Sequence, residues 1–148
     1  MQAIARAKSI VHAPPMQVFE AFVNPESMGQ FWFHRKDHGL KPNESVTFYL
    51  GDNDDAFGFS VEVLELLPAR LIHIKWGDDD GWTEVKWLLE EIAAGDTLLT
   101  IEESGFSGSE AEILDRVIDS TAGFNQVIIA AKALLEHGAV INVVLDHA

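Results

Sequence analysis

Glu103 is the acidic residue best placed to take part in chemistry. Residues 97–104 are predicted to form a strand, in which every second side chain points to the same side, so Glu103 falls on the same strand face as Leu99 and Ile101. A carboxylate on such an apolar face can orient a ligand hydroxyl or amine, or act as a general base. The alternative is a structural acid at a strand end, which reaches solvent or accepts a backbone N–H beside Gly105. Both interpretations remain open, and no residue is assigned as catalytic.

Two histidines suggest a metal site that the surrounding sequence does not support. His34 and His38 are four residues apart with Asp37 between them, a spacing that on a helix would place both imidazoles on one face. Gly29 precedes the stretch and Gly39 follows it, which disfavours a helix. We therefore predict a solvated loop and no metal site, with His34 near the mouth of a cavity.

Three further motifs also lack the full pattern of a functional site. The aspartates of residues 51–58 and 77–81 lack the twelve-residue calcium loop and its distal glutamate, so they predict hairpin turns. Residues 105–109, GFSGS, place Ser109 where a nucleophile elbow needs glycine. No phosphate-binding glycine loop or dinucleotide fingerprint is present in the sequence. We expect no cofactor, and the sequence gives little support for an enzyme.

Composition narrows the classes of partner. The 148 residues are 47% hydrophobic, which predicts one compact domain over residues 1–148. Ten Lys and Arg against 24 Asp and Glu give a net charge of -14, which repels nucleic acid and anionic membrane surfaces. The absence of cysteine excludes disulfides and thiolate zinc sites. We expect a cytoplasmic protein, as a monomer or a weak homodimer, without a membrane partner.

Hydrophobic periodicity predicts an α+β arrangement. A first strand over residues 3–13 precedes two short helices, the second capped by Asn24 with Pro25 at its first position. Turn residues then separate short apolar runs, which should pair as antiparallel hairpins. These predicted strands cover residues 45–50, 56–67, 70–77, 82–92 and 97–104.

The last predicted element is one long helix over residues 110–137. Ser109 and Glu112 form a capping box at its start, and Gly138 follows its end. Gly123 in its middle predicts close packing or a bend, because glycine costs about 1 kcal/mol there relative to alanine. The apolar stripe of the helix contains Ile113, Val117, Thr121, Phe124, Ile128, Ala131 and Leu135.

Strand alternation identifies the side chains that should face this helix. In residues 82–92 one face carries Thr83, Val85, Trp87 and Leu89, and the other carries Glu84, Lys86 and Glu90. The same reasoning in the other strands, with the aromatic residues of the connecting segments, gives an aromatic lining around Glu103. Most of these rings are alternatively ordinary core residues. The candidate ligand-binding residues are Trp32, His34, Phe57, Phe59, Trp76, Trp87, Ile101, Glu103, Phe106 and Phe124.

The chain also resembles a known family. Residues 11–32, 61–77, 97–106 and 123–138 are similar to successive signatures of the activator-of-Hsp90-ATPase-like proteins, in the START and birch-pollen-allergen-like (SRPBCC) superfamily. This resemblance implies a helix-grip fold, in which a curved antiparallel sheet wraps around the long C-terminal helix. It also implies a deep cavity that holds lipids, hormones, polyketides or other apolar molecules. Phe124 departs from the tryptophan that the family commonly has after glycine, which removes an indole donor.

Together these observations favour a binding module for a small hydrophobic molecule, with Glu103 as its polar anchor. One alternative is a cochaperone-like domain that binds a chaperone through its outer surface, as the family resemblance implies. Another is a cyclase, dehydratase or hydrolase acting within the cavity.

Overall fold

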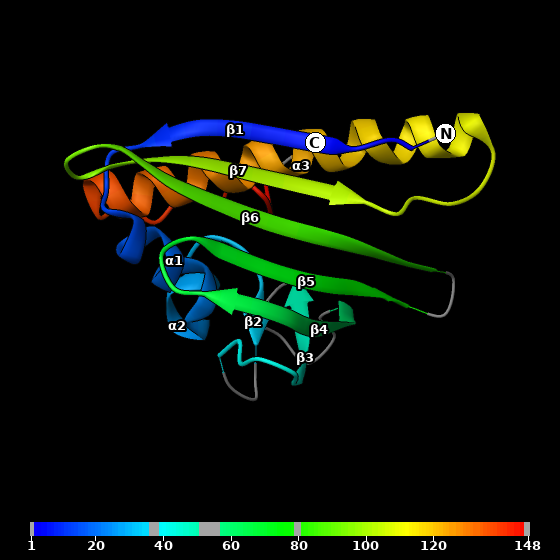
Figure 1. Ribbon diagram of the computed structural model, residues 1–148, viewed down its shortest axis with the longest axis horizontal. Helices are drawn as coiled ribbons and strands as arrows, with labels where there is room; N and C mark the ends of the chain where they lie inside the picture. Colours follow the sequence, from blue (N-terminus) through cyan, green and yellow to red (C-terminus); the bar gives the residue numbers. More distant parts are fainter. Residues whose placement is uncertain (1, 36–38, 51–56, 79–80, 147–148) are drawn as a thin grey trace.

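The computed structural model describes residues 2–35, 39–50, 57–78 and 81–146 (Figure 1), without the side chains of His34, Arg35, Leu50, Phe57 and Asp78. Parts of the histidine stretch, residues 34–38, and of both predicted aspartate turns, residues 51–58 and 77–81, therefore lie outside the described residues. The elements are β1 (Ala5–Val11), α1 (Pro15–Val23), α2 (Pro25–Gly29), β2 (His34–Arg35), β3 (Ser45–Leu50), β4 (Phe57–Leu67), β5 (Leu71–Asp78), β6 (Gly81–Ala93), β7 (Asp96–Ser104) and α3 (Glu110–His137).

The strands form one antiparallel sheet in the order β1-β7-β6-β5-β4-β3-β2. Consecutive strands from β3 to β7 pair as hairpins, as the short turns predicted. The prediction of a loop at His34 was wrong, because His34 and Arg35 pair with Tyr49 and Phe48 as the short strand β2. A two-residue strand is too short to show an alternating pattern, so the sequence carried no signal for it.

Local capping explains where the helices begin and end. The Asn24 side chain accepts the backbone N–H of Glu26 at 2.9 Å at the start of α2. The Ser109 hydroxyl accepts the N–H of Glu112 at 3.2 Å, and donates to the Glu112 carboxylate at 3.0 Å. Gly138 ends α3 with a φ of 64°, the left-handed conformation that glycine adopts readily. The predicted bounds of α3 and the α+β fold are confirmed.

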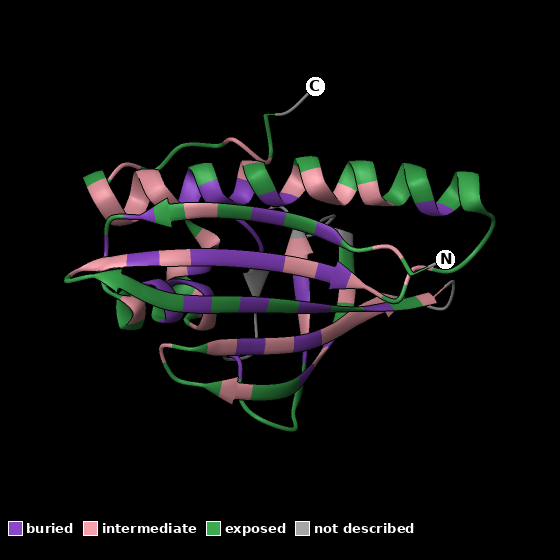
Figure 2. Ribbon diagram, turned by 45° about the horizontal axis from the view of Figure 1, so that its top comes forward, coloured by how far each residue is buried: buried purple, intermediate pink, exposed green. Residues whose placement is uncertain are grey.

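Helix α3 packs along β1, at one edge of the sheet (Figures 1 and 2). The Nζ atom of Lys132 donates to the Ile10 carbonyl at 2.5 Å, and the Glu136 carboxylate accepts the backbone N–H of His12 at 3.2 Å. Lys132 and Glu136 are themselves paired at 2.8 Å. Because β1 is an edge strand, these contacts satisfy backbone groups that would otherwise be open to another chain.

Glu136 should therefore make the stability of the protein depend on pH. Its burial on its own would raise the pKa of the carboxyl, but the hydrogen bonds from Lys132 and His12 outweigh it and lower the pKa below its ordinary value of 4.5. The stabilisation is then present above pH 4.5 and is lost as the pH falls through the lowered pKa. Glu136→Gln should cost about 1 kcal/mol near neutral pH, and the difference from the parent protein should shrink on acidification.

Urea unfolding at a series of pH values measures this dependence. Glu91→Gln, which removes a carboxylate at an exposed position on β6, is the matched control and should change the free energy of unfolding much less near neutral pH. A destabilisation by Glu136→Gln that stays constant down to acid pH would contradict the role given to the carboxylate.

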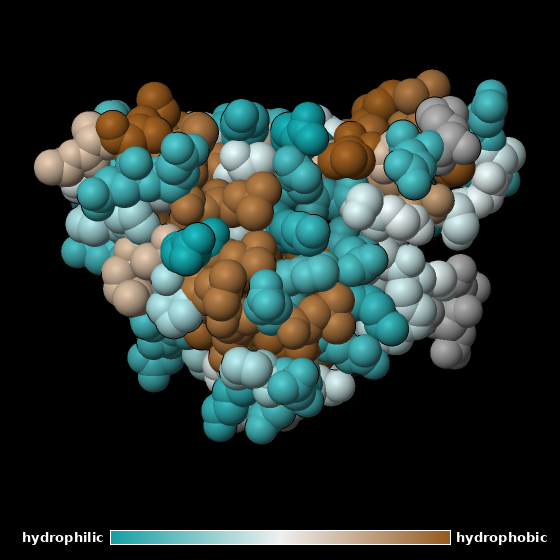
Figure 3. All heavy atoms as spheres, in the orientation of Figure 1, coloured by the Kyte–Doolittle hydropathy of each residue, from teal (hydrophilic) through white to brown (hydrophobic). Residues whose placement is uncertain are grey.

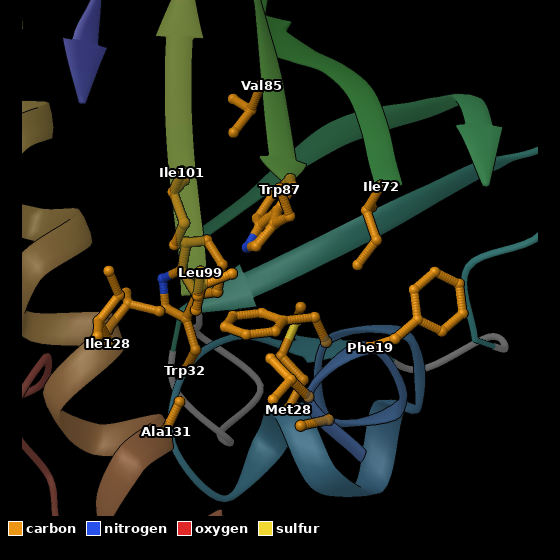
Figure 4. Close-up of a cluster of buried hydrophobic side chains, with 14 of the residues drawn as sticks. Phe19, Met28, Trp32, Ile72, Val85, Trp87, Leu99, Ile101, Ile128 and Ala131 are labelled. Atoms are coloured by element: carbon orange, nitrogen blue, oxygen red, sulfur yellow. The ribbon is translucent and has the colours of Figure 1, made fainter. Parts of the chain in front are cut away.

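The core lies between the sheet and the helices, and aromatic rings make up much of it (Figure 4). On β6 the inward positions are buried and the outward ones exposed from Trp82 to Glu90, which confirms the predicted alternation. Trp87 is 1% exposed, and its ring centroid lies 5.8 Å from that of Phe22 and 5.9 Å from that of Trp32. Rings from α1, β6 and the segment after α2 therefore pack together in the core.

Candidate ligand-binding site

Glu103 is a buried carboxylate whose hydrogen bonding is only half satisfied. It is 4% exposed, and its Oε2 atom accepts from the Trp76 indole N–H at 3.1 Å and from the Thr83 hydroxyl at 2.5 Å. Its other oxygen, Oε1, has no hydrogen-bond partner among the described residues. Buried polar atoms are nearly always paired in folded proteins, so this oxygen is available to a donor from outside the chain.

The strand register brings these three side chains together. Trp76 pairs with Thr83 across β5 and β6, and Val85 pairs with Glu103 across β6 and β7. Thr83 therefore stands diagonal to Glu103 on the inward face of the sheet, at a separation that side chains can bridge. The sequence placed Glu103 and Thr83 on this face by alternation, but only the register shows that they touch.

A small pocket of about 220 Å³ opens beside Glu103. Arg116 of α3 lines it from the helix side, with its guanidinium 5.2 Å from the ring centroid of Phe106. An acceptor and a cation thus share a pocket with aromatic walls, which suits a ligand that carries a hydroxyl or amine donor. The pocket is lined by Phe59, Trp76, Gly77, Gly81, Thr83, Glu103 and Arg116.

A larger groove of about 590 Å³ runs between the middle of α3 and the aromatic side chains. The Trp76 ring stacks on Phe124 with centroids 6.1 Å apart, and Trp32 meets Trp76 edge-on at 5.9 Å. Trp76 lines both the groove and the small pocket, so one ring borders both openings. The groove is lined by Trp32, Phe33, Trp76, Asp119, Ser120, Ala122, Gly123, Phe124, Gln126, Val127 and Val144.

Gly123 faces this groove and is not packed against a neighbour. A Cβ atom built at Gly123 would meet nothing within 4 Å. Of the two alternatives predicted for this glycine, close packing was therefore wrong among the described residues, and a bend stays a prediction. A glycine here leaves the groove wider than any other residue would.

The candidate residues from the sequence separate into three groups. Trp32, Trp76 and Phe124 line the groove, and Phe59, Trp76 and Glu103 line the small pocket. Trp87 and Ile101 belong to the core cluster, and Phe106 is half-buried beneath Arg116; none of the three is among the described residues lining either opening. His34 and Phe57 have their backbones in β2 and β4, while their side chains lie outside the described part of the structure.

Most of the residues that α3 contributes to the pocket and the groove were not among the candidates predicted from the sequence. Arg116, Ser120, Gly123 and Val127 are spaced by four, three and four residues, which places them on one face of α3. That spacing is a signal for the groove-facing side of the helix, but the apolar stripe is the stronger periodic pattern in the sequence. Val144 reaches the groove from the segment after α3, where no periodicity points to it.

The comparisons with known proteins agree with this architecture. Residues 12–136 match the family model described as "Activator of Hsp90 ATPase homolog 1-like protein". No curated protein matches the chain.

Within the described residues, no helix is long and apolar enough to cross a membrane.

Several solved structures have the same fold. Protein SSP2350 from Staphylococcus saprophyticus is 25% identical, with a TM-score of 0.77, over 95% of this chain and 96% of that one. DynU16, a putative protein in the dynemicin biosynthetic locus, is 24% identical with a TM-score of 0.78, over 93% of this chain and 48% of that one. The Aha1 dimer from Colwellia psychrerythraea is 16% identical with a TM-score of 0.73, over 92% and 98% of the two chains.

Proposed function

Since this chain belongs to the activator of Hsp90 ATPase homolog 1-like family, we propose that it binds a small apolar molecule between α3 and the sheet. The ligand lies in the aromatic groove and extends past Trp76, so that a hydroxyl or amine group donates to Oε1 of Glu103. The groove volume of about 590 Å³ is within the usual range for small-molecule sites, and its walls combine rings with a few polar groups.

The observation that carries this proposal is the unpaired Oε1 atom of Glu103. Leaving a buried acceptor unsatisfied costs about 1–3 kcal/mol, and a charged one costs more. A ligand donor would recover that free energy, and this gives the site a preference for molecules with a hydroxyl or amine over purely apolar ones.

A protein partner is the second candidate, and the family description supports a chaperone. Leu114 and Ile118 are each 57% exposed on α3, one turn apart, and give that helix an apolar outer side.

Catalysis in the pocket is the third candidate, for which Glu103 is the acid or base. Glu103→Gln should abolish any turnover, because an amide cannot take up a proton. It should also weaken ligands that donate to Oε1, because Trp76 and Thr83 keep the amide oxygen in the place of Oε2 and an NH2 donor then replaces Oε1. Turnover measured in the parent protein therefore distinguishes catalysis from binding alone.

Substitution of Gly123 tests ligand binding with a matched pair of variants. Because a Cβ at Gly123 meets nothing within 4 Å, Gly123→Leu should fold while its side chain fills the groove. It should weaken ligand binding at least about tenfold, which corresponds to about 1.4 kcal/mol. Gly123→Ala adds only a methyl group, so it should retain binding and stabilise α3 by up to about 1 kcal/mol.

Binding is measured with a panel of aromatic phenols and amines, as a rise in melting temperature and a change in tryptophan fluorescence that Trp76→Phe reduces. Matched hydrocarbons without a donor should bind more weakly. A panel that changes neither signal in the parent protein would contradict the proposal and favour the protein-partner candidate. Equal binding by the parent and the Gly123→Leu variant would contradict the location of the site.

A further inference from the structure

A continuous row of side chains crosses the outer face of the sheet, opposite the ligand groove. Its members are successive register partners on neighbouring strands. Strand alternation turns them away from the core, because neighbouring positions such as Ile72, Leu89 and Ile101 are buried. Thr100 in the middle of the row is only 8% exposed. The row passes from Lys8 to Thr100, Leu88, Leu71 and Leu67.

Four strand spacings separate the two ends of this row, a length of about 19 Å. Three of the five side chains in the row are leucines, and Lys8 stands at one end, so the row is called the apolar track. Figure 3 shows the outer face of the sheet, where an apolar area is bordered by hydrophilic residues.

The track lies in a groove of about 680 Å³, which is larger than the groove beneath α3. The turn between β4 and β5 forms one side of it, and the backbone N–H of Leu89 on β6 donates to the carbonyl of Arg70 in that turn. The groove is lined by Arg6, Lys8, Leu67, Arg70, Leu71, Leu88, Leu89, Glu90, Leu98, Thr100 and Glu102.

The charge of this groove is opposite in sign to the charge of the whole chain. Three of the ten Lys and Arg residues line it, against two of the 24 acids. Arg6 is paired with Glu102 at 2.9 Å. Lys8 and Arg70 have no ion-pair or hydrogen-bond partner for their side chains among the described residues, so they remain available to an anion.

We propose that this outer groove binds an anionic amphiphile with a single long apolar chain, such as a long-chain carboxylate. The leucines of the track accept the chain, and Lys8 or Arg70 at its ends pairs with the acid. An extended anionic surface is repelled by the net charge of -14. A single carboxylate in the groove senses mainly the nearby cations, because salt screens charges more than about 8 Å away. This site is separate from the ligand groove beneath α3.

Titration calorimetry with dodecanoate, kept below its micelle concentration, tests the charge requirement. The double variant Lys8→Gln/Arg70→Gln should weaken dodecanoate binding by about three- to tenfold. The control Lys75→Gln/Lys86→Gln removes the same charge from the same face outside the groove and should leave binding nearly unchanged. Uncharged dodecanol should bind the parent and both variants alike.

Two further variants test the location. Leu88→Asn should weaken binding of both dodecanoate and dodecanol, whereas Ile92→Asn, at another exposed position on β6, should not. Gly123→Leu should leave dodecanoate binding intact. Absence of dodecanoate binding, an equal loss in both double variants, or a loss in Gly123→Leu would each overturn the proposal. The last outcome would place dodecanoate in the groove beneath α3 and so leave the proposed function standing.

Discussion

Trp87→Ala is expected to lower the free energy of unfolding by about 3–5 kcal/mol. The Trp87 side chain is 1% exposed and contacts the rings of Phe22 and Trp32, so truncation leaves a large void between β6, α1 and the segment after α2. A loss of this size is a large fraction of the stability of an ordinary domain, which is about 5–15 kcal/mol. Urea unfolding followed by circular dichroism measures it.

Trp82→Ala is the matched control, because Trp82 lies on the same strand at an outward position and is 38% exposed. It should cost only about 1 kcal/mol, through loss of the contact with Lys75, whose Nζ atom lies 5.2 Å from the ring centroid. Trp87→Phe should cost much less than Trp87→Ala, because it keeps most of the ring and removes an indole N–H that has no partner among the described residues. Equal costs for Trp87→Ala and Trp82→Ala would contradict the burial of Trp87.

Gly77→Ala is expected to destabilise the protein by about 2–3 kcal/mol. A Cβ atom at Gly77 would lie 2.2 Å from the carbonyl oxygen of Gly81 and 2.9 Å from the Cα atom of Trp82. Both are backbone atoms of the paired strand, which cannot move aside as a flexible side chain can. The β5–β6 hairpin would have to open, and Trp76 and Thr83 would shift relative to Glu103.

Gly81→Ala separates this clash from the effect of backbone conformation. Gly81 lies in the same hairpin with a similar φ, 154° against 159°, but among the described residues a Cβ there approaches only the Ser107 hydroxyl, at 3.9 Å. Gly77→Ala should therefore cost more than Gly81→Ala in thermal unfolding. It should also weaken binding of hydroxyl-bearing ligands at Glu103. Equal melting temperatures for the two variants would contradict a costly clash between a Cβ atom at Gly77 and the backbone of β6.

The elements with strong local signals were predicted closely. The capping box at Ser109 and the glycine at 138 defined both ends of α3, because capping depends on residues within one turn of the helix end. Alternation in residues 82–92 identified the buried side of β6, including Thr83 and Trp87. The same rule placed Glu103 in the interior, and its 4% exposure agrees.

Other features depend on residues far apart in the sequence. The strand β2 is two residues long, and Gly123 faces open space because no side chain in the described part of the chain reaches it. Arg116 lines the pocket of Glu103, yet the two belong to α3 and β7 and are connected by no shared pattern. The deep cavity implied by the family resemblance corresponds here to a pocket and a groove beside a ring-filled core.

The amino-acid sequence by itself determined the order of the main elements, the ends of α3 and the face on which most strand side chains lie. These properties follow from backbone conformation and from contacts between residues a few positions apart. Only the tertiary structure decided which inward side chains touch, which oxygen of Glu103 stays unpaired, and where space remains open. Those outcomes depend on how rings from distant elements pack together, because a shift of one ring can fill or open a groove while every local pattern stays the same.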